Sequence, residues 1–286
     1  GRGNSKVSPQ KREKILEIAR NFSYRPNLSA LNLAGRSTKT IGIIPETSIF
    51  CAEIQLALST CLRAFGYHTL FMPLVTHYDE DMVIGQLLAY GVDGIISLNK
   101  KGNFAHDKLK VPSILVSYEN YDVDLDWKDG FRQAAEHLIG HGHKRIGFLV
   151  DSWHYSAELM LEGYRSAMNH AGLPCPDSWS IELLWNEKFS DNLNDLIHKE
   201  KITAFLCSTD LITGRLIIWL KQHGIRVPED IAVIGCHGNT FGESMSPSLT
   251  SLIYPVHEIC RTAAEMMIHK IEAKEFSRAA LPVKIK

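Results

Sequence analysis

Few residues of this chain have the types and spacing that catalysis requires. His137 and His141 stand four residues apart on one face of an expected helix, as metal-binding histidines do, but Leu138 lies where a zinc-protease helix carries glutamate. The chain also contains no phosphate-binding Gly-rich loop and no Gly-x-Ser-x-Gly motif. We therefore interpret the two histidines as a structural pair, and we expect no enzyme activity, no metal site and no cofactor.

Aromatic side chains near expected strand ends offer ligand-binding chemistry instead. Trp179 and Trp185 flank one expected strand, and Trp153 and Tyr155 follow another. Aromatic rings beside a cleft stack on sugars, although rings in these positions can equally belong to the core. Trp185 is therefore a candidate ligand contact with a core role as its alternative.

Charge is distributed unevenly along the 286 residues. Residues 1–39 carry nine basic and two acidic side chains, whereas the rest of the chain carries 22 basic and 30 acidic ones. A net charge of plus seven at one end and minus eight elsewhere indicates a polyanionic partner for that end alone. A solubilising tail would have the same composition.

The basic segment also has helical patterning. Ser8 and Pro9 form a helix-start signal, and the apolar residues of 15–22 share one face of the expected helix. After a break at 24–26, Asn27 can cap a second helix over 28–34, which Gly35 ends. About seven residues are too few for a stable helix in water, so we expect this second helix to form only against a partner.

From residue 40 onward, strand-like and helix-like patterns alternate. Apolar runs of strand length occur at 41–45, 68–74, 92–98, 112–118, 145–150, 181–185, 203–207, 231–236 and 249–254. Helical patterns occur at 51–65, 79–90, 128–140, 156–171, 190–199, 210–223 and 256–273. Apolar strands that alternate with helices are typical of parallel sheets covered on both faces. The sequence therefore predicts an α/β fold of doubly wound parallel sheets.

The length fits two such units, with a break near residues 126–127. We expect residues 40–126 and about 255–275 to form one lobe, and residues 127–254 and about 278–286 to form the other. Several crossings between lobes would create a cleft, in which ligands bind at the carboxyl ends of strands.

The cysteines and the hydropathy indicate a cellular location. The six cysteines include no Cys-x-x-Cys pair and lie mostly in apolar surroundings, which disfavours a disulfide framework and favours a reducing cytoplasm. No apolar run reaches the 18 residues of a membrane span, and residues 1–14 do not have the pattern of a signal peptide. We expect a cytoplasmic protein.

Motifs along nearly the whole chain resemble the lactose-repressor/galactose-repressor (LacI/GalR) family of bacterial transcription regulators. They are Tyr24-Arg25-Pro26-Asn27, Leu33-Ala34-Gly35, the run Glu-His-Leu-Ile-Gly-His-Gly-His-Lys-Arg-Ile at 136–146, Glu162-Gly163-Tyr164-Arg165, the run at 224–235 and Pro247-Ser248-Leu249-Thr250. The resemblance implies a helix-turn-helix headpiece, a hinge helix and a two-lobed core like that of periplasmic sugar-binding proteins. It also implies a homodimer that binds near-palindromic operator DNA.

The resemblance implies how the amino-terminal residues contact DNA. Residues 1–25 would be the third headpiece helix, with the base-reading helices preceding Gly1, and residues 26–39 would be the hinge helix and linker. Leu33 matches the leucine that wedges into the minor groove and kinks the duplex, and Ala30 lies on the same side. The expected DNA-contacting residues are Lys11, Arg12, Tyr24, Asn27, Ala30 and Leu33.

The effector site departs from the pattern of the family. Met160 stands where many members have arginine, and His237 replaces the first aspartate after the strand that ends near Gly235, whereas Asp210 is kept. The run around His237 resembles gluconate-type repressors. The expected effector-binding residues are Phe50, Met160, Trp185, Asp210 and His237.

His237 has two interpretations. As a cation it would suit a sugar acid such as gluconate, and affinity would rise as pH falls through the ordinary histidine pKa of about 6.5. As a loop residue facing water it would have no such role. Met160 argues against an anionic ligand, because a basic residue would be expected there.

Two functions remain. The first is a repressor whose affinity for operator DNA is changed by a small carbohydrate-type effector, with sugar acids as one candidate class. The second is a sugar-binding protein of transport or chemotaxis with the same core, which would require export.

Overall fold

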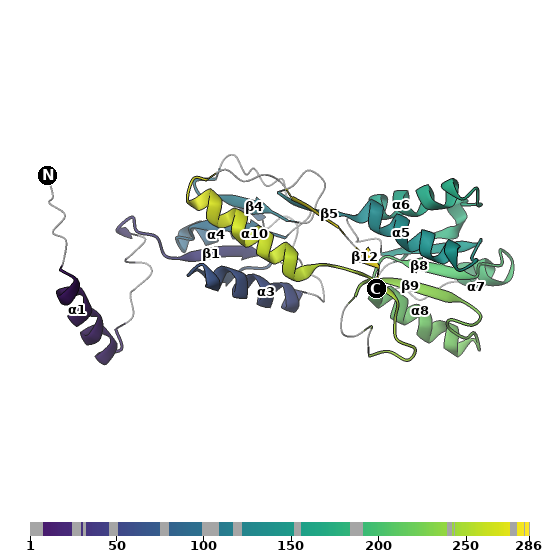
Figure 1. The fold of residues 1–286 in the computed structure, drawn as a ribbon, viewed down its shortest axis with the longest axis horizontal. Coiled ribbons are helices and arrows are strands. Elements are labelled where there is room, and N and C mark those ends of the chain that lie inside the picture. The colour runs from purple at the N-terminus through teal and green to yellow at the C-terminus, as the bar shows by residue number, and fades with distance from the viewer. Residues whose placement is uncertain are drawn as a thin grey trace.

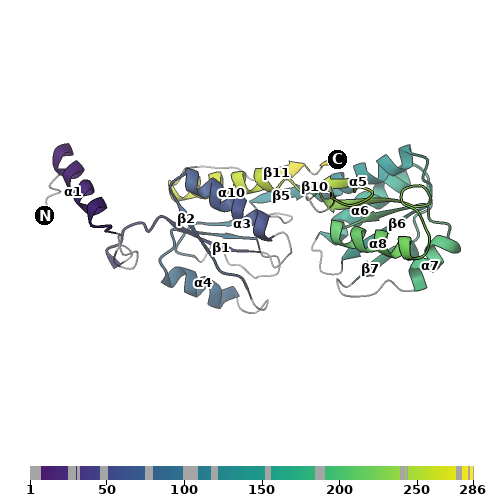
Figure 2. The same ribbon diagram turned by 90° about the horizontal axis from the view of Figure 1, so that it is seen from below.

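The first lobe is built on a parallel four-stranded sheet in the order β2-β1-β3-β4. Its strands are β1 (Thr40–Ile44), β2 (His68–Phe71), β3 (Gly94–Ser97) and β4 (Ser113–Leu115). In this computed structural model, α3 (Cys51–Ala64) and α10 (Val256–Ile271) cover one face of the sheet and α4 (Glu80–Ala89) covers the other (Figure 2). Branched apolar residues of β1 and β3 are fully buried between these layers, which explains why the strands read as continuous apolar runs.

The second lobe contains a six-stranded sheet in the order β12-β10-β9-β8-β6-β7. Its strands are β6 (Ile146–Asp151), β7 (Ser180–Leu183), β8 (Ala204–Cys207), β9 (Ala232–His237), β10 (Ser251–Ile253) and β12 (Lys284–Ile285). All pairs are parallel except β10 with β12. Helices α5 (Trp127–Gly140) and α6 (Ala157–His170) cover one face, and α7 (Asp191–His198) and α8 (Asp210–Gln222) cover the other (Figure 1). A short 3₁₀ turn, Asp177–Trp179, precedes β7.

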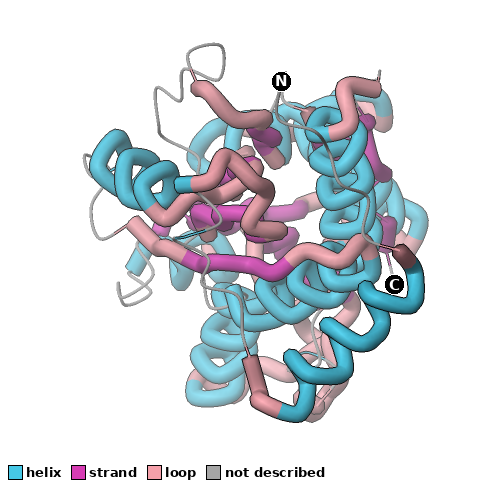
Figure 3. The backbone as a smooth tube through the Cα atoms, turned by 90° about the vertical axis from the view of Figure 1, so that its left-hand side faces the viewer, coloured by secondary structure: helices cyan, strands magenta, loops and turns pink. Residues whose placement is uncertain are grey.

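Three connections join the lobes. Strand β5 (Val123–Asp126) leads into α5, the segment after β10 leads back into α10, and β11 (Ala279–Pro282) pairs in parallel with β5 (Figure 1). Seen along the long axis, helices surround the strands (Figure 3). The described residues are 8–24, 30, 33–45, 51–74, 80–98, 109–116, 122–151, 156–183, 191–238, 242, 244–274, 279–282 and 284–285.

The amino-terminal helix α1 (Pro9–Asn21) stands apart from both lobes (Figure 1). The Ser8 hydroxyl accepts a hydrogen bond from the Lys11 backbone N–H, with Pro9 in the first turn, as the sequence predicts. No residue of α1 is buried, and Phe22 just after it is 81% exposed.

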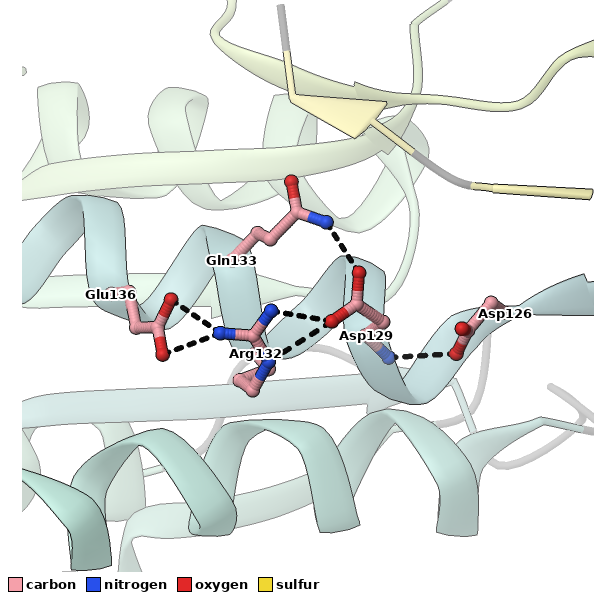
Figure 4. Close-up of polar contacts among 5 residues, drawn as sticks. All are labelled: Asp126, Asp129, Arg132, Gln133 and Glu136. Carbon is pink, nitrogen blue, oxygen red and sulfur yellow. Dashed lines mark hydrogen bonds and ion pairs between the residues drawn. The ribbon is translucent and has the colours of Figure 1, made fainter.

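A polar network fixes the start of α5 (Figure 4). The Asp126 carboxylate caps the helix by accepting from the Asp129 backbone N–H at 3.0 Å. Arg132 donates to Asp129 and to Glu136, one turn away on either side, and Gln133 donates to the second oxygen of Asp129. These hydrogen bonds lower the pKa of Asp129. They anchor the first two turns of α5 directly beside the crossing between lobes.

The expected fold class is confirmed: the chain is an α/β protein of parallel sheets covered by helices. Two details differ from the expectation. Residues 123–126, which are not among the expected strands, form one because Val123 and Leu125 are buried and β11 supplies their hydrogen-bonding partner. The last strand, β12, is antiparallel to its neighbour. None of the helices in the described residues is long and apolar enough to cross a membrane.

Candidate functional site

The carboxyl ends of β8 and β9 bring two of the predicted site residues to the same edge of the second sheet. Asp210 begins α8 directly after β8, and Thr209 caps that helix through its hydroxyl, which accepts from the Ile212 backbone N–H. His237 is the last residue of β9. Because β8 and β9 are parallel neighbours, their carboxyl ends lie at the same edge of the sheet. Ligands of α/β proteins bind at that edge.

Ser251 links these two strand ends. Its hydroxyl donates to the Asp210 Oδ1 at 2.6 Å and accepts from the Gly238 backbone N–H at 3.0 Å. Asp210 is fully buried, so this charge-assisted hydrogen bond is made away from water. A side chain at Gly235 would place its Cβ 2.4 Å from the same carboxylate oxygen. Asp210 therefore organises the edge of the sheet.

His237 has an unusual backbone and an unusual electrostatic environment. Its φ of 113° lies in the region that favours glycine, which costs a histidine about 1–3 kcal/mol and persists only where neighbouring contacts impose it. The residue reaches the surface in part, but its Nδ1 is buried, and burial lowers the pKa of the imidazole to about 4. At neutral pH only about one molecule in a thousand would carry a charge there. Burial thus lowers the His237 pKa below the ordinary value of about 6.5 from which the sequence-based expectation started.

The aromatic ring of Tyr254 lies against His237. The Tyr254 ring lies edge-on to the imidazole, with centroids 5.8 Å apart, and the Tyr254 backbone N–H donates to the His237 carbonyl at 3.1 Å. Tyr254 also stacks on Trp127 at 5.8 Å. Sequence analysis missed Ser251, Tyr254 and Trp127. The first two could have been found, because they lie on the expected strand next to the one that ends at His237.

The other predicted effector contacts are placed differently. Met160 lies on α6 with no exposed surface, inside the hydrophobic core that α5 and α6 share with the sheet. Met160 is as fully buried as Asp210, so its contact with an effector stays a prediction. Phe50 and Trp185 lie outside the described residues. Trp179, considered with Trp185, is a core residue 3% exposed.

His137 and His141 pack against each other at the end of α5 and satisfy its backbone. The rings of His137 and His141 have centroids 4.3 Å apart, and the His141 Nδ1 lies 2.8 Å from the His137 carbonyl oxygen. The hydrogen bond satisfies one of the last carbonyls of the helix. Among the described residues, no group of three or more histidine, cysteine or acidic side chains is placed to hold a metal ion.

Comparisons with known proteins identify the family. Residues 135–285 match the family described as periplasmic binding protein-like domain. Catabolite control protein A of Priestia megaterium is 29% identical over 93% of this chain and 85% of its own length. A structure of the Lac repressor bound to ONPG superposes with a TM-score of 0.84 at 21% identity, over 100% of this chain and 92% of that one. A complex of the regulator CelR with cellobiose gives a TM-score of 0.75 at 23% identity, over 99% of this chain and 90% of that one. The chain belongs to the periplasmic binding protein-like family, in its LacI/GalR branch.

This membership confirms the resemblance read from the sequence. The curated relatives are named as regulators and repressors of transcription, so the chain is a LacI-type transcriptional regulator and not an enzyme. The finer resemblance to gluconate-type repressors has no support in these comparisons.

The residues expected to contact DNA in a LacI-type regulator lie at the amino-terminal end, away from the sheet edge with Asp210. Lys11 and Arg12 are exposed on α1, and Tyr24 is 68% exposed just after it. Ala30 and Leu33 are helical and exposed, Leu33 to 90%, and Ala34 donates to the Ala30 carbonyl. Asn27 lies outside the described residues.

Ala30 and Leu33 belong to a helical turn, called the hinge turn below, at the place of the expected hinge helix. It is present in this single chain, whereas we expected the helix to form only against a partner. The hinge turn contains the backbone hydrogen bond from Ala34 to the Ala30 carbonyl, and the Leu33 side chain is exposed to water. Such a turn has little to stabilise it by itself, so its folding in solution remains a prediction.

Proposed function

We propose that this chain is an effector-controlled DNA-binding regulator: a homodimer whose affinity for operator DNA changes when a small carbohydrate binds between its lobes. The observation that carries the effector half is the edge of the second sheet, where Ser251 joins Asp210 to the backbone beside His237. A fixed set of polar groups at the carboxyl ends of parallel strands is the usual form of an α/β ligand site. The structural relative in complex with cellobiose has the same fold.

We propose a neutral carbohydrate as the effector. A neutral imidazole can donate one hydrogen bond and accept another, which suits a sugar hydroxyl. A sugar acid such as gluconate would have to bind the protonated form about a thousandfold more tightly than the neutral form to keep His237 charged at pH 7, given a pKa of about 4. The sugar-acid hypothesis therefore requires a ligand with a strong preference for the protonated imidazole, a requirement that the sequence alone did not show.

The DNA half of the proposal rests on the charge and exposure of the amino-terminal residues. Lys11 and Arg12 would contact phosphates, which supplies salt-dependent affinity without reading bases. Tyr24, Asn27 and Ala30 would support Leu33, whose exposed side chain would wedge into the minor groove. A structural relative, the Lac repressor dimer, is described as bound to operator, with a TM-score of 0.83.

The homodimer would bury apolar side chains that the first lobe exposes. Leu56 on α3 is 70% exposed, and Met82 and Tyr90 on and after α4 are 55% and 63% exposed. A two-fold partner over this lobe would also bring two hinge helices together, as a near-palindromic site requires. A cytoplasmic location remains a prediction.

A thermal-shift screen tests the effector half. The ligand set contains neutral mono- and disaccharides, sugar acids and purines, because a compound that binds only the folded state raises Tm. We expect one neutral carbohydrate to raise Tm, and Asp210→Asn or His237→Ala to remove that rise. Hits confined to purines, or a rise that survives both substitutions, would contradict the proposed site. Phe22→Ala, at an exposed position just after α1 and remote from the sheet edge, is the control that should keep the full rise.

If the hit is a sugar acid, calorimetry at several pH values decides how it binds. A carboxylate held by a charged His237 takes up a proton on binding, so affinity should rise about tenfold for each unit that pH falls from 7 toward 4. A neutral carbohydrate should bind equally well across that range. A sugar acid whose affinity does not change with pH would show that His237 is not its cation.

A further inference from the structure

Two connections between the lobes meet at a stacked pair of aromatic rings. Trp127 is the first residue of α5 and directly follows β5, which leads out of the first lobe. Tyr254 lies in the segment from β10 to α10, which leads back into the first lobe. Their centroids are 5.8 Å apart, with an interplanar angle of 28°. Segments more than one hundred residues apart in sequence are thus joined where β5, α5 and β10 converge (Figures 1 and 2).

Trp127 is a fixed support for this stack. It is 2% exposed and continues into a row of rings through Phe131 and Phe148, with centroid separations of 6.5 and 5.8 Å. Phe148 stacks on Tyr164, whose hydroxyl donates to the Ile146 carbonyl. Trp127 is the first residue of α5, and the Asp126 cap shown in Figure 4 fixes that end of the helix. Movement of Trp127 would therefore disturb the core of the second lobe.

Tyr254 joins this support to the strand end. Its ring edge meets His237, and its backbone N–H donates to the carbonyl of that residue, so two separate contacts act on one position. That position has a φ of 113°. A backbone conformation of this kind persists only where neighbouring contacts impose it, and such conformations cluster at ligand sites and switches. Tyr254 supplies two of the contacts.

We propose that Tyr254 is a positioning residue that holds the His237 ring at the carboxyl end of β9 and, through Trp127, links the position of that ring to the connection between the lobes. A ligand that contacts His237 then changes the relative position of the lobes through Tyr254. This last step rests on the proposed function, whereas the positioning of His237 by Tyr254 does not.

Titration of His237 in the full chain without ligand tests the positioning step. Among the described residues, Asp210 is linked to the backbone beside the ring through Ser251, and the neighbouring buried Cys236 thiol has its pKa raised well above 9. Burial is the cause of the low imidazole pKa, so removal of the covering ring should admit water and raise it. The histidine ring-proton resonances are recorded by NMR between about pH 4.5 and 8, and His237→Gln assigns the signal.

The variants distinguish the effect of the Tyr254 ring on the His237 midpoint from the effects of its hydroxyl and of its side-chain volume. Wild type and Tyr254→Phe should give a His237 midpoint below about pH 5, whereas Tyr254→Leu should move it by one unit or more toward 6.5. Phe22→Leu, which removes a ring that is 81% exposed just after α1, should change nothing. Tyr254→Met replaces Tyr254→Leu if the leucine variant does not fold, and the same shift is expected.

Three results would overturn the positioning of His237. They are an unchanged midpoint in both ring-deleted variants, an equal shift in Tyr254→Phe, or an equal shift in Phe22→Leu. A residue that only fills core volume would alter Tm in Tyr254→Leu and leave the His237 midpoint where it was.

Small-angle scattering with the carbohydrate found by the screen tests the link to the lobes. The ligand should change the scattering profile of wild type and of Tyr254→Phe, and should bind Tyr254→Leu without the same change. A full ligand-induced change in Tyr254→Leu would refute the link. If no carbohydrate binds, the proposed function fails, and the titration still decides the role of Tyr254.

Discussion

A single substitution relative to the family pattern gives the candidate site its distinctive chemistry. An aspartate at position 237 would be an anionic acceptor, whereas the buried histidine is a neutral group that both donates and accepts. The sequence places the histidine correctly at a strand end. It could not predict the charge state, because the pKa depends on burial by residues distant in sequence, such as Tyr254.

The first residue-scale prediction concerns stability at low pH. The pKa of His237 is about 4 in the folded chain and about 6.5 when unfolded, so the unfolded state binds the proton more readily. Its contribution is fully present above pH 6.5 and is lost as pH falls toward 4, by up to about 3 kcal/mol. Urea unfolding at pH 7 and pH 4.5 should therefore show a smaller loss of stability in His237→Gln than in wild type. Equal losses would contradict the buried neutral state.

A second residue-scale prediction concerns Gly163, in the Glu-Gly-Tyr motif. A Cβ at this position would lie 2.2 Å from the Lys128 carbonyl oxygen, so the backbones of α5 and α6 would have to separate. We expect Gly163→Ala to lower the free energy of unfolding by about 2–4 kcal/mol, within the range of severe overpacking. Gly140→Ala, with open space around the position, is the matched control on α5. A loss below about 1 kcal/mol in Gly163→Ala would contradict the close approach of the helices.

At the scale of elements, the first prediction concerns the hinge turn and its role in DNA binding. The turn around Ala30 and Leu33 is helical but exposed, so its side chains contribute little to the stability of the free chain. In the protein as its gene encodes it, Leu33→Ala should weaken operator binding at least tenfold and leave Tm and ligand affinity unchanged. Fluorescence anisotropy with a labelled operator measures the first quantity. Unchanged operator affinity would show that Leu33 is not the wedge.

Helices α3 and α4 carry the prediction for self-association. Leu56 is 70% exposed on α3, whereas Leu58, two residues on, is fully buried in the core. Light scattering at micromolar concentration should give twice the chain mass of 32.2 kDa for wild type. Leu56→Arg together with Met82→Arg should give the monomer mass with its helical circular dichroism retained. The outward-facing Ile218→Arg on α8 controls for added charge. A monomeric wild type would contradict the dimer.

For the whole molecule, the order of strands and helices could be predicted from the sequence because strands such as β1, β3 and β8 are apolar runs buried between two helical layers. The pairing of β5 with β11 could not be predicted, because it joins residues about 155 apart by backbone hydrogen bonds that leave no pattern in either segment. Position in the sequence also could not show the burial of Met160: its neighbourhood in a motif suggested a ligand contact, and the structure packs it on α6 into the hydrophobic core.

Ligand-dependent operator binding is the most direct test of the central claim. Sites are selected from a random DNA pool with the protein as its gene encodes it, and affinity for the selected site is then measured at fixed salt with and without the carbohydrate from the screen. The account predicts a near-palindromic site and a change in Kd of at least about tenfold, which His237→Ala reduces or abolishes. Failure to enrich any sequence, or a Kd that no bound carbohydrate changes, would contradict it.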